Sequence, residues 1–209
     1  GIDMTKVDTR TRLMDIAEAS VLEKGFGATS IDELIAETGI TKSGFFYHFR
    51  DKNALAMALL QRYLAREEEL LDDLFGRARE LHDDPLHAFL IGLKLLSELM
   101  DDLPNGHPGC LVATYCYNER LFDREVRSLY TDALLTWRKR FRGYLAEIAE
   151  RYPPREPVDL DALADMVNNT VEGGIIMSKA LRDPKVLVKQ ILLFRTYVRL
   201  LFDPTAASA

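Results

Sequence analysis

The sequence predicts an all-α protein of nine helices. Apolar residues recur three and four positions apart through most of the 209 residues, which is the spacing of one helix face, and no segment shows the alternation of a half-buried strand. Breaks that contain glycine or proline separate these periodic segments. Hydrophobic residues make up 47% and charged residues 29% of the chain, which is typical of globular proteins and excludes a chain that is disordered throughout.

The first helix is expected over Thr9–Lys24. Leu13, Ala17 and Val21 fall on one of its faces, as in a helix that packs against a core. Gly25 follows directly and is typical of a residue that ends a helix.

Two short helices are expected next. Ser30 and Glu33 have the spacing of a capping box, which opens a helix that runs to Glu37. After a turn with a central glycine, Thr41 is expected to cap a third helix over Lys42–Phe49. Helix, tight turn and helix together form a helix-turn-helix arrangement, whose second helix enters the major groove of DNA in many regulators.

Six further helices complete the predicted fold. A proline at the first turn opens the second of them, and the last opens with Asp183 as N-cap followed by Pro184. Proline-containing breaks lie at 82–85, 103–109 and 152–157. The expected helices cover residues 51–78, 86–100, 110–118, 126–148, 160–181 and 184–201.

Composition limits the classes of protein to which the chain can belong. Two cysteines are too few for a disulfide framework, and no apolar run is long enough to span a membrane, so we expect a cytoplasmic protein without membrane contact. The net charge of −6 argues against binding nucleic acid through bulk charge. A local DNA-reading surface remains compatible with that charge.

Several short stretches between Thr9 and Lys52 occur in a fixed order. They are TRTR at 9–12, GF at 25–26, ATSI at 28–31, TKSGFFYHF at 41–49 and DK at 51–52. In this order they resemble the N-terminal domain of the TetR/AcrR family of bacterial transcriptional regulators. GCLV at 109–112 and EGG at 172–174, with Ala180, are similar to one branch of that family.

The resemblance implies an all-α homodimer whose two small N-terminal domains bind adjacent major grooves of a palindromic operator. It also implies a larger C-terminal domain that binds a small effector and releases the DNA. We therefore expect a helix-turn-helix domain over 1–52, an effector-binding and dimerisation domain over 53–209, and a ligand-responsive regulator, most simply a repressor. No cofactor is expected.

The resemblance to the TetR/AcrR family also implies, position by position, which residues of this chain would face DNA. Position 46 is commonly tyrosine in the family, with a hydroxyl that can reach phosphate, but it is phenylalanine here, so that contact is lost or Tyr47 replaces it. The candidate DNA-binding residues are Thr29, Thr41, Lys42, Ser43, Gly44, Tyr47, His48 and Lys52.

Charge supports this interface only in part. Residues 1–52 contain seven Lys/Arg against nine Asp/Glu, so this domain has a net charge of −2. The basic residues must therefore gather on the DNA-facing side, and Arg10, Arg12, Lys42 and Lys52 are the candidates.

An effector pocket is expected among the helices of the C-terminal domain. Such pockets are mostly apolar with a few polar groups, so an apolar or aromatic effector is expected. The candidate lining residues are Leu96, Met100, Cys110, Tyr115, Trp137, Phe141, Asn169 and Glu172.

The last two helices are the expected dimer interface. Gly173 and Gly174 lie inside a helix, where each costs about 1 kcal/mol relative to alanine, so close approach of another helix or room for a ligand is the expected compensation. The final helix is apolar over a broad arc and needs cover on more than one side. A four-helix interface between two copies satisfies both features.

Other classes of function have less support in the sequence. Cys110 follows His107, and a Cys–His pair can form a nucleophile, but no surrounding motif specifies an enzyme. His82, His87 and His107 match no known spacing of metal ligands. The alternative to a DNA-binding regulator is a helical protein-interaction module that does not bind DNA.

Overall fold

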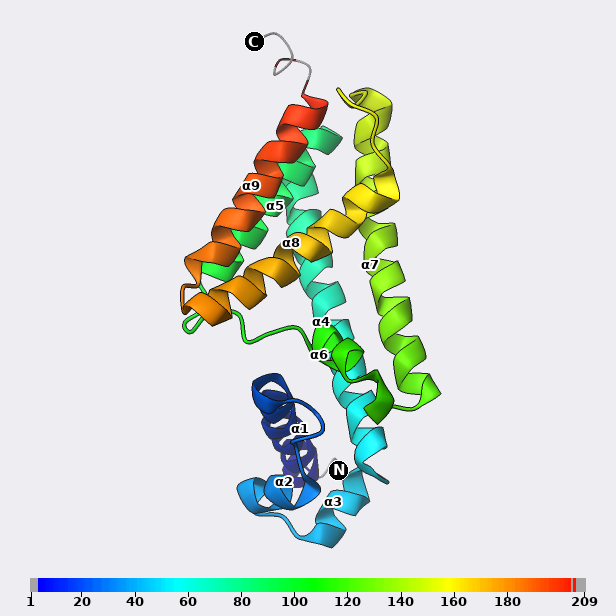
Figure 1. Ribbon diagram of the computed structural model, residues 1–209, viewed down its shortest axis with the longest axis vertical. Coiled ribbons are helices and arrows are strands. Elements are labelled where there is room, and N and C mark those ends of the chain that lie inside the picture. The colour runs from blue at the N-terminus through cyan, green and yellow to red at the C-terminus, as the bar shows by residue number, and fades with distance from the viewer. Residues whose placement is uncertain (1–3, 204, 206–209) are drawn as a thin grey trace. The chain divides into compact units, whose positions relative to one another are not determined.

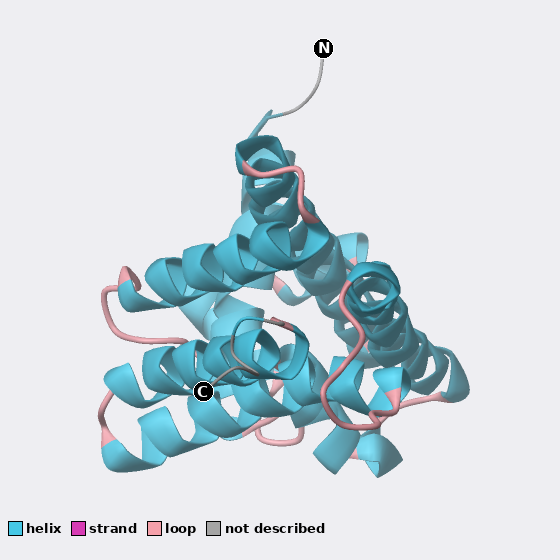
Figure 2. Cartoon of the chain, turned by 90° about the horizontal axis from the view of Figure 1, so that it is seen from above, coloured by secondary structure: helices cyan, strands magenta, loops and turns pink. Residues whose placement is uncertain are grey.

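The computed structural model describes residues 4–203 and residue 205. The described residues form nine α-helices and one short 3-10 helix, and no strand occurs among them (Figures 1 and 2). The α-helices are α1 (Met4–Lys24), α2 (Ile31–Thr38), α3 (Lys42–His48), α4 (Lys52–Leu81), α5 (Pro85–Asp101), α6 (Leu111–Tyr117), α7 (Arg124–Arg151), α8 (Leu160–Leu181) and α9 (Lys185–Phe202), and the 3-10 helix η1 is Glu119–Leu121. The all-α prediction is confirmed.

The local signals at the helix-turn-helix segment act as the sequence predicts. The Ser30 hydroxyl accepts a hydrogen bond from the backbone N–H of Glu33 at 3.1 Å and caps α2. Gly39 ends α2 with φ of +73°, a left-handed conformation that glycine adopts without steric cost. The Thr41 hydroxyl caps α3 by accepting from the N–H of Gly44 at 3.0 Å.

Most helix ends differ from the prediction by one to five residues. α1 begins at Met4 instead of Thr9. α4 continues past Ala78 to Leu81, because the charged residues Arg79 and Glu80 extend the helix without adding to its apolar periodicity. Asp183 was predicted to be the N-cap of α9, and this prediction is wrong because the N-cap is Pro184. The Asp183 carboxylate accepts from the N–H of Lys185 at 3.0 Å, so it still satisfies a free donor of the first turn from one position earlier.

The chain divides into two compact units. One unit contains the residues up to Arg66 together with Cys110–Ala133, and the other contains Glu67–Gly109 together with the residues from Leu134 onward. The long helices α4 and α7 each contribute residues to both units. The functional division expected at residue 52 stays a prediction.

The first unit is held by a core under the helix-turn-helix segment. Leu13, Ala17 and Phe45 are fully buried, as expected for the residues that fix the angle between α2 and α3. Tyr115 of α6 stacks on Phe122 with ring centroids 4.3 Å apart, and its hydroxyl donates to the carbonyl oxygen of Ala56 in α4 at 2.8 Å. This bond satisfies the one polar group of a completely buried ring.

In the second unit, α9 packs against both α5 and α8 (Figure 1). The approach of α8 to α9 is close at Gly174, where an added Cβ would lie 2.7 Å from Cδ1 of Leu187 and 3.0 Å from its Cα. The expected close approach of another helix is therefore confirmed at Gly174, and the other helix is α9 of the same chain. A Cβ at Gly173 would meet nothing within 4 Å.

Candidate nucleic-acid interface

One face of α3 is buried and the other is open to solvent. Phe45 and the adjacent Phe49 are buried, which anchors the helix on the core of its unit. Lys42 and Ser43 are exposed, and Tyr47 is 67% exposed. Phe46, at the position where the family commonly has tyrosine, is 42% exposed and has no hydroxyl to offer a phosphate. The exposed face of α3 thus carries one cation, two hydroxyl groups and one apolar ring.

Several candidate residues have a structural partner as well. The Thr41 hydroxyl caps α3 and lies 3.2 Å from the Ser43 hydroxyl. His48 is half-buried, with its ring edge-to-face against Tyr47 at 5.1 Å between centroids. Gly44 is half-buried; an added Cβ would lie 3.2 Å from Thr41 Oγ1, so a larger residue would press on the cap. The capping hydroxyl and Gly44 thus fix the start of the helix that would face DNA.

Thr29 lies in the interior of its unit. Its side chain is 1% exposed, and its hydroxyl donates to the carbonyl oxygen of Gly25 at 2.9 Å. The same hydroxyl lies 2.8 Å from that of Ser20 in α1. The geometry therefore gives Thr29 a part in joining the end of α1 to the start of α2, and it does not support a direct contact of the side chain with DNA.

Three of the four basic residues expected on the DNA-facing side have partners within the unit. The Lys52 ammonium donates to the carbonyl oxygen of Phe26 at 2.8 Å and lies 4.5 Å from the centre of its ring, and burial lowers the pKa of Lys52. Arg10 lies 4.9 Å from the centre of the Phe49 ring, and Arg12 donates to the backbone oxygen of Thr38. Lys42 pairs with no carboxylate among the described residues.

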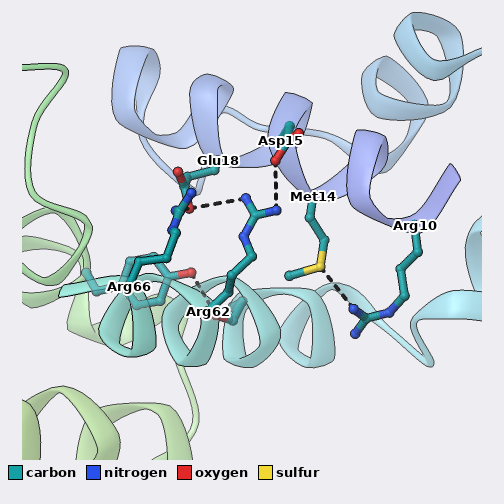
Figure 3. Close-up of polar contacts among 8 residues, drawn as sticks. Arg10, Met14, Asp15, Glu18, Arg62 and Arg66 are labelled. Carbon is teal, nitrogen blue, oxygen red and sulfur yellow. Dashed lines mark hydrogen bonds and ion pairs between the residues drawn. The ribbon is translucent and has the colours of Figure 1, made fainter. Parts of the chain in front are cut away.

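A network of charged side chains joins α1 to the first part of α4 (Figure 3). Arg62 donates to Asp15 at 2.7 Å and to Glu18 at 3.3 Å, and Arg66 donates to Glu18 at 2.6 Å. Glu18 is the centre of the network, with its side chain only 15% exposed. Arg10 donates to the sulfur of Met14 on the same face of α1. The network fixes the helix that supports α2 and α3, although Asp15, Glu18, Arg62 and Arg66 were not among the predicted site residues.

The second unit contains a cavity of about 300 Å³ between α4, α5 and α7. Phe75, Phe89 and Tyr144 provide aromatic surface, with centroids of Phe75 and Tyr144 5.0 Å apart. Arg79 pairs with Glu147, and Arg140 donates to Asp72 at 2.5 Å, so the cavity is lined by two cations and two anions. The charges that line the cavity are balanced, and three of its ten lining residues are aromatic.

The eight residues predicted to line an effector pocket lie in both units. Cys110 and Tyr115 belong to the first unit, and the other six belong to the second. None of the eight lines the 300 Å³ cavity, but Phe141 packs against its wall residue Phe75 at 5.8 Å between centroids. Asn169 is exposed and Glu172 is half-buried. That these residues contact an effector stays a prediction.

The histidines and cysteines were weighed in the sequence as sites for catalysis or metal binding. His107 uses Nδ1 to accept from the N–H of Gly109 at 3.0 Å, and Cys110 is buried. His82 and His87 stack with centroids 4.8 Å apart, and the part of the chain that is described contains no group of three or more His, Cys, Asp or Glu side chains placed to hold a metal ion. Among the described helices, none combines the length and apolar character needed to cross a bilayer.

Comparison with known proteins identifies the segment around α3. Residues 13–59 match the family described as bacterial regulatory proteins, tetR family. The transcriptional regulator AcuR of Cereibacter sphaeroides is 26% identical over 160 residues, which cover 75% of this chain and 70% of AcuR. The crystal structure of a regulatory protein TetR from Rhodobacter sphaeroides superposes with a TM-score of 0.71 at 25% identity, covering 90% of this chain and 97% of that chain. The helix-turn-helix segment of this chain matches the TetR family, and the chain has the fold of a TetR-family regulator.

The match to the TetR family points to DNA binding as the role of the helix-turn-helix segment. The comparisons support DNA binding by this chain, and the proteins that it resembles are transcriptional regulators. The repressor NemR of Escherichia coli K12 is 29% identical over 85 residues, which are 41% of this chain and 43% of NemR, so that alignment covers less than half of either protein.

Proposed function

We propose that this TetR-family regulator is a repressor that binds a palindromic operator as a homodimer and releases it when a small aromatic molecule binds the second unit. The observation that carries the DNA-binding part is the exposed face of α3, anchored through Phe45 and Phe49. Lys42 is the main cationic contact, with Ser43 and Tyr47 as hydrogen-bond donors to phosphate or base edges. Thr41, Gly44 and His48 belong to the same surface.

Thr29 and Lys52 are assigned supporting parts in this interface. Thr29 holds the start of α2 through its bond to Gly25. Lys52 keeps two N–H donors besides the one directed at Phe26, which is enough for a phosphate contact at the start of α4. Arg10 and Arg12 hold α1 against the segment that reads DNA.

Exposed apolar side chains support the dimer. α8 exposes Met166, Ile176, Met177 and Leu181, and α9 exposes Leu193, Tyr197 and Leu200. Seven large apolar side chains on two adjacent helices are more than a monomer ordinarily leaves open to water. A second copy that presents the same two helices covers them and brings two α3 helices into one molecule, as binding to a palindrome requires.

The 300 Å³ cavity is the proposed effector site. Gly76 lines it from the last two turns of α4, and an added Cβ there would meet nothing within 4 Å, so packing does not require a glycine. A glycine inside a helix nevertheless costs about 1 kcal/mol relative to alanine. The absence of a side chain at Gly76 leaves space in the cavity for an effector, and this accounts for the glycine. The aromatic walls and the balanced charge favour an uncharged aromatic ring over an ion.

Release follows from a shift between two populations of the dimer. α4 is one continuous helix that carries Gly76 and Arg79 of the cavity and, nearer its start, Lys52 and the two arginines that bind α1. An effector that binds one arrangement of α4 more tightly than another shifts the dimer toward the first. The shift is limited by the difference between the two affinities.

The proposal is tested by selecting bound duplexes from random DNA with the full chain and sequencing them. An enriched inverted repeat is expected, and its two halves are to be centred about 34–36 Å apart or a multiple of that. Affinity for the selected site is expected to fall steeply with salt. A folded protein that enriches no repeat at low salt would overturn the proposed operator and favour a helical protein-interaction module.

A further inference from the structure

A second hollow of the second unit has a different chemical character from the effector cavity. It has a volume of about 460 Å³ and lies between the loop that follows α5 and the C-terminal end of α8. Three prolines form much of its wall. The lining side chains with hydrogen-bond donors are Asn105, His107, Ser178, Lys179 and Arg182, and no carboxylate is among the lining residues. We call this hollow the loop groove.

The hydrogen bonds of the loop groove leave donors unused. The Lys179 ammonium donates one hydrogen to the carbonyl oxygen of Pro108 at 2.7 Å and keeps two more. His107 accepts from the N–H of Gly109 through Nδ1, so its neutral ring carries the proton on Nε2. Burial, and next the charge of Lys179, lower the pKa of His107 to about 4. The ring is therefore a neutral donor at neutral pH.

Arg182 stands where a glycine would be expected. It ends α8 with φ of +53°, and it is the one non-glycine residue with positive φ in the described part of the chain. The left-handed conformation at a helix end is ordinarily taken by glycine because a Cβ is strained there. An arginine at this position sets its guanidinium on the wall of the loop groove at the cost of a strained backbone. Strain of this kind is concentrated at functional sites.

The nearby carboxylates form no ion pair with Lys179 or Arg182. Asp183 follows Arg182, but its side chain accepts from the backbone N–H of Lys185. Asp101 pairs with the Lys185 ammonium. Lys179 and Arg182 thus have no acidic partner among the described residues, and two cations share one groove. Such a groove attracts a counter-ion.

We propose that the loop groove is a binding site for a small anion that carries a carboxylate or phosphate group. The anion accepts hydrogen bonds from Lys179, Arg182 and Nε2 of His107. It joins the loop after α5 to the end of α8 within the second unit. This site is separate from the aromatic cavity, shares no lining residue with it and does not depend on what that cavity binds.

The test measures thermal unfolding of the full chain while sodium phosphate or sodium acetate replaces sodium chloride at constant ionic strength. We expect at least one of the two anions to raise the melting temperature in a saturable way. Arg182→Gln keeps the strained backbone and removes the charge, so the apparent affinity for that anion is expected to fall roughly tenfold or more. Lys139→Gln removes one exposed charge of α7 in the same unit and is expected to leave the affinity unchanged.

Arg182→Gly separates strain from binding. Without anion this variant is expected to melt about 2–4 °C above the native chain, because glycine adopts the left-handed conformation freely. With anion it is expected to lose most of the stabilisation. A response to phosphate alone identifies a phosphate site, and a response to acetate alone identifies a carboxylate site.

The His107 ring signal provides a second measurement in the same samples. A bound anion favours the charged ring, so the pKa of His107 is expected to rise in the native chain and not in Arg182→Gln. Three results would each overturn the proposal: no stabilisation by either anion beyond chloride, full stabilisation retained in both Arg182 variants, or a His107 titration that the anion leaves unchanged.

Discussion

Arg66 of α4 donates to the carboxylate of Glu18 of α1 at 2.6 Å, and the same oxygen of Glu18 accepts from Arg62 at 3.3 Å (Figure 3). Glu18 is largely shielded from water, and Nε of Arg62 is buried without a partner among the described residues. The Glu18 carboxylate therefore balances the charge of two guanidinium groups, and one of these groups, that of Arg62, has a nitrogen without a hydrogen-bond partner in the described part of the chain. This arrangement fixes α1, on which the helix-turn-helix segment rests, to the first part of α4.

Glu18→Gln is expected to destabilise the first unit by about 1–3 kcal/mol, because a shielded guanidinium loses its counter-charge. The measurement is urea unfolding followed by circular dichroism. Asp15→Asn is the control, since Asp15 is 61% exposed and contacts only Arg62 in this network. It is expected to cost about 0–1 kcal/mol. Equal losses in the two variants would show that Glu18 is not the centre of the network.

The fold could be predicted from the sequence because its signals are local. Ser30 and Thr41 cap the helices that directly follow them, and Gly39 ends the helix that directly precedes it, as predicted. The roles of Thr29 and Lys52 could not be settled in this way. Whether a threonine hydroxyl faces DNA or Gly25 depends on how α1 and α2 pack, and family position alone does not report that packing.

The sequence contains only a weak signal for the charged network between α1 and α4. Arg62 and Arg66 lie four residues apart on one helix, and Asp15 and Glu18 lie three apart on another, so each pair shares a helix face. Nothing local shows that these two faces meet across more than forty residues. The cavity at Gly76 was missed for a similar reason, because a glycine inside a helix does not reveal whether packing or space explains it.

Lys42→Ala is expected to weaken operator binding and to leave the assembly state unchanged. Its side chain is exposed and contributes no contact that holds the fold. If the ammonium contacts a phosphate, the slope of log affinity against log salt is expected to fall by about one. Titration of the selected operator at several salt concentrations measures both effects. Lys139→Ala, in the second unit, is the matched control, and equal affinities in the two variants would remove Lys42 from the interface.

Leu193→Glu is expected to dissociate the dimer without unfolding the chain, because Leu193 of α9 is 62% exposed in the single chain. A charge at Leu187 or Phe194, by contrast, is expected to unfold the second unit, since both are buried within one chain. Sedimentation velocity together with circular dichroism separates the two outcomes. Leu81→Glu, at an exposed leucine of α4, is the control. A Leu193→Glu dimer as tight as the native one would move the interface away from α9.

Gly76→Leu is expected to fill the effector cavity and abolish binding of an aromatic probe. Indole serves as the probe, and NMR signals of the cavity residues report its binding to the native chain. Gly143→Ala is the control: Gly143 is a helical glycine of α7 with open space around it, but it does not line the cavity. Both variants are expected to gain up to about 1 kcal/mol in stability from helix propensity. Indole shifts that persist unchanged in Gly76→Leu would place aromatic binding elsewhere.

Tyr152→Phe is expected to make the second unit more sensitive to acid. Burial raises the pKa of Asp84, but hydrogen bonds from Tyr152 and His87 and the charge of Arg151 outweigh burial and hold that pKa at about 2, below its ordinary 3.8. The stability that this lowered pKa contributes is therefore complete above about pH 4 and is lost as the pH falls toward 2. Without the phenol hydroxyl, which donates to Asp84 at 2.7 Å, the pKa of Asp84 is expected to rise and the loss of stability to begin at higher pH.

Acid unfolding followed by circular dichroism measures this shift, with Tyr117→Phe, at an exposed tyrosine, as the control. Coinciding acid transitions in Tyr152→Phe and the native chain would show that the bond to Asp84 does not set this pKa.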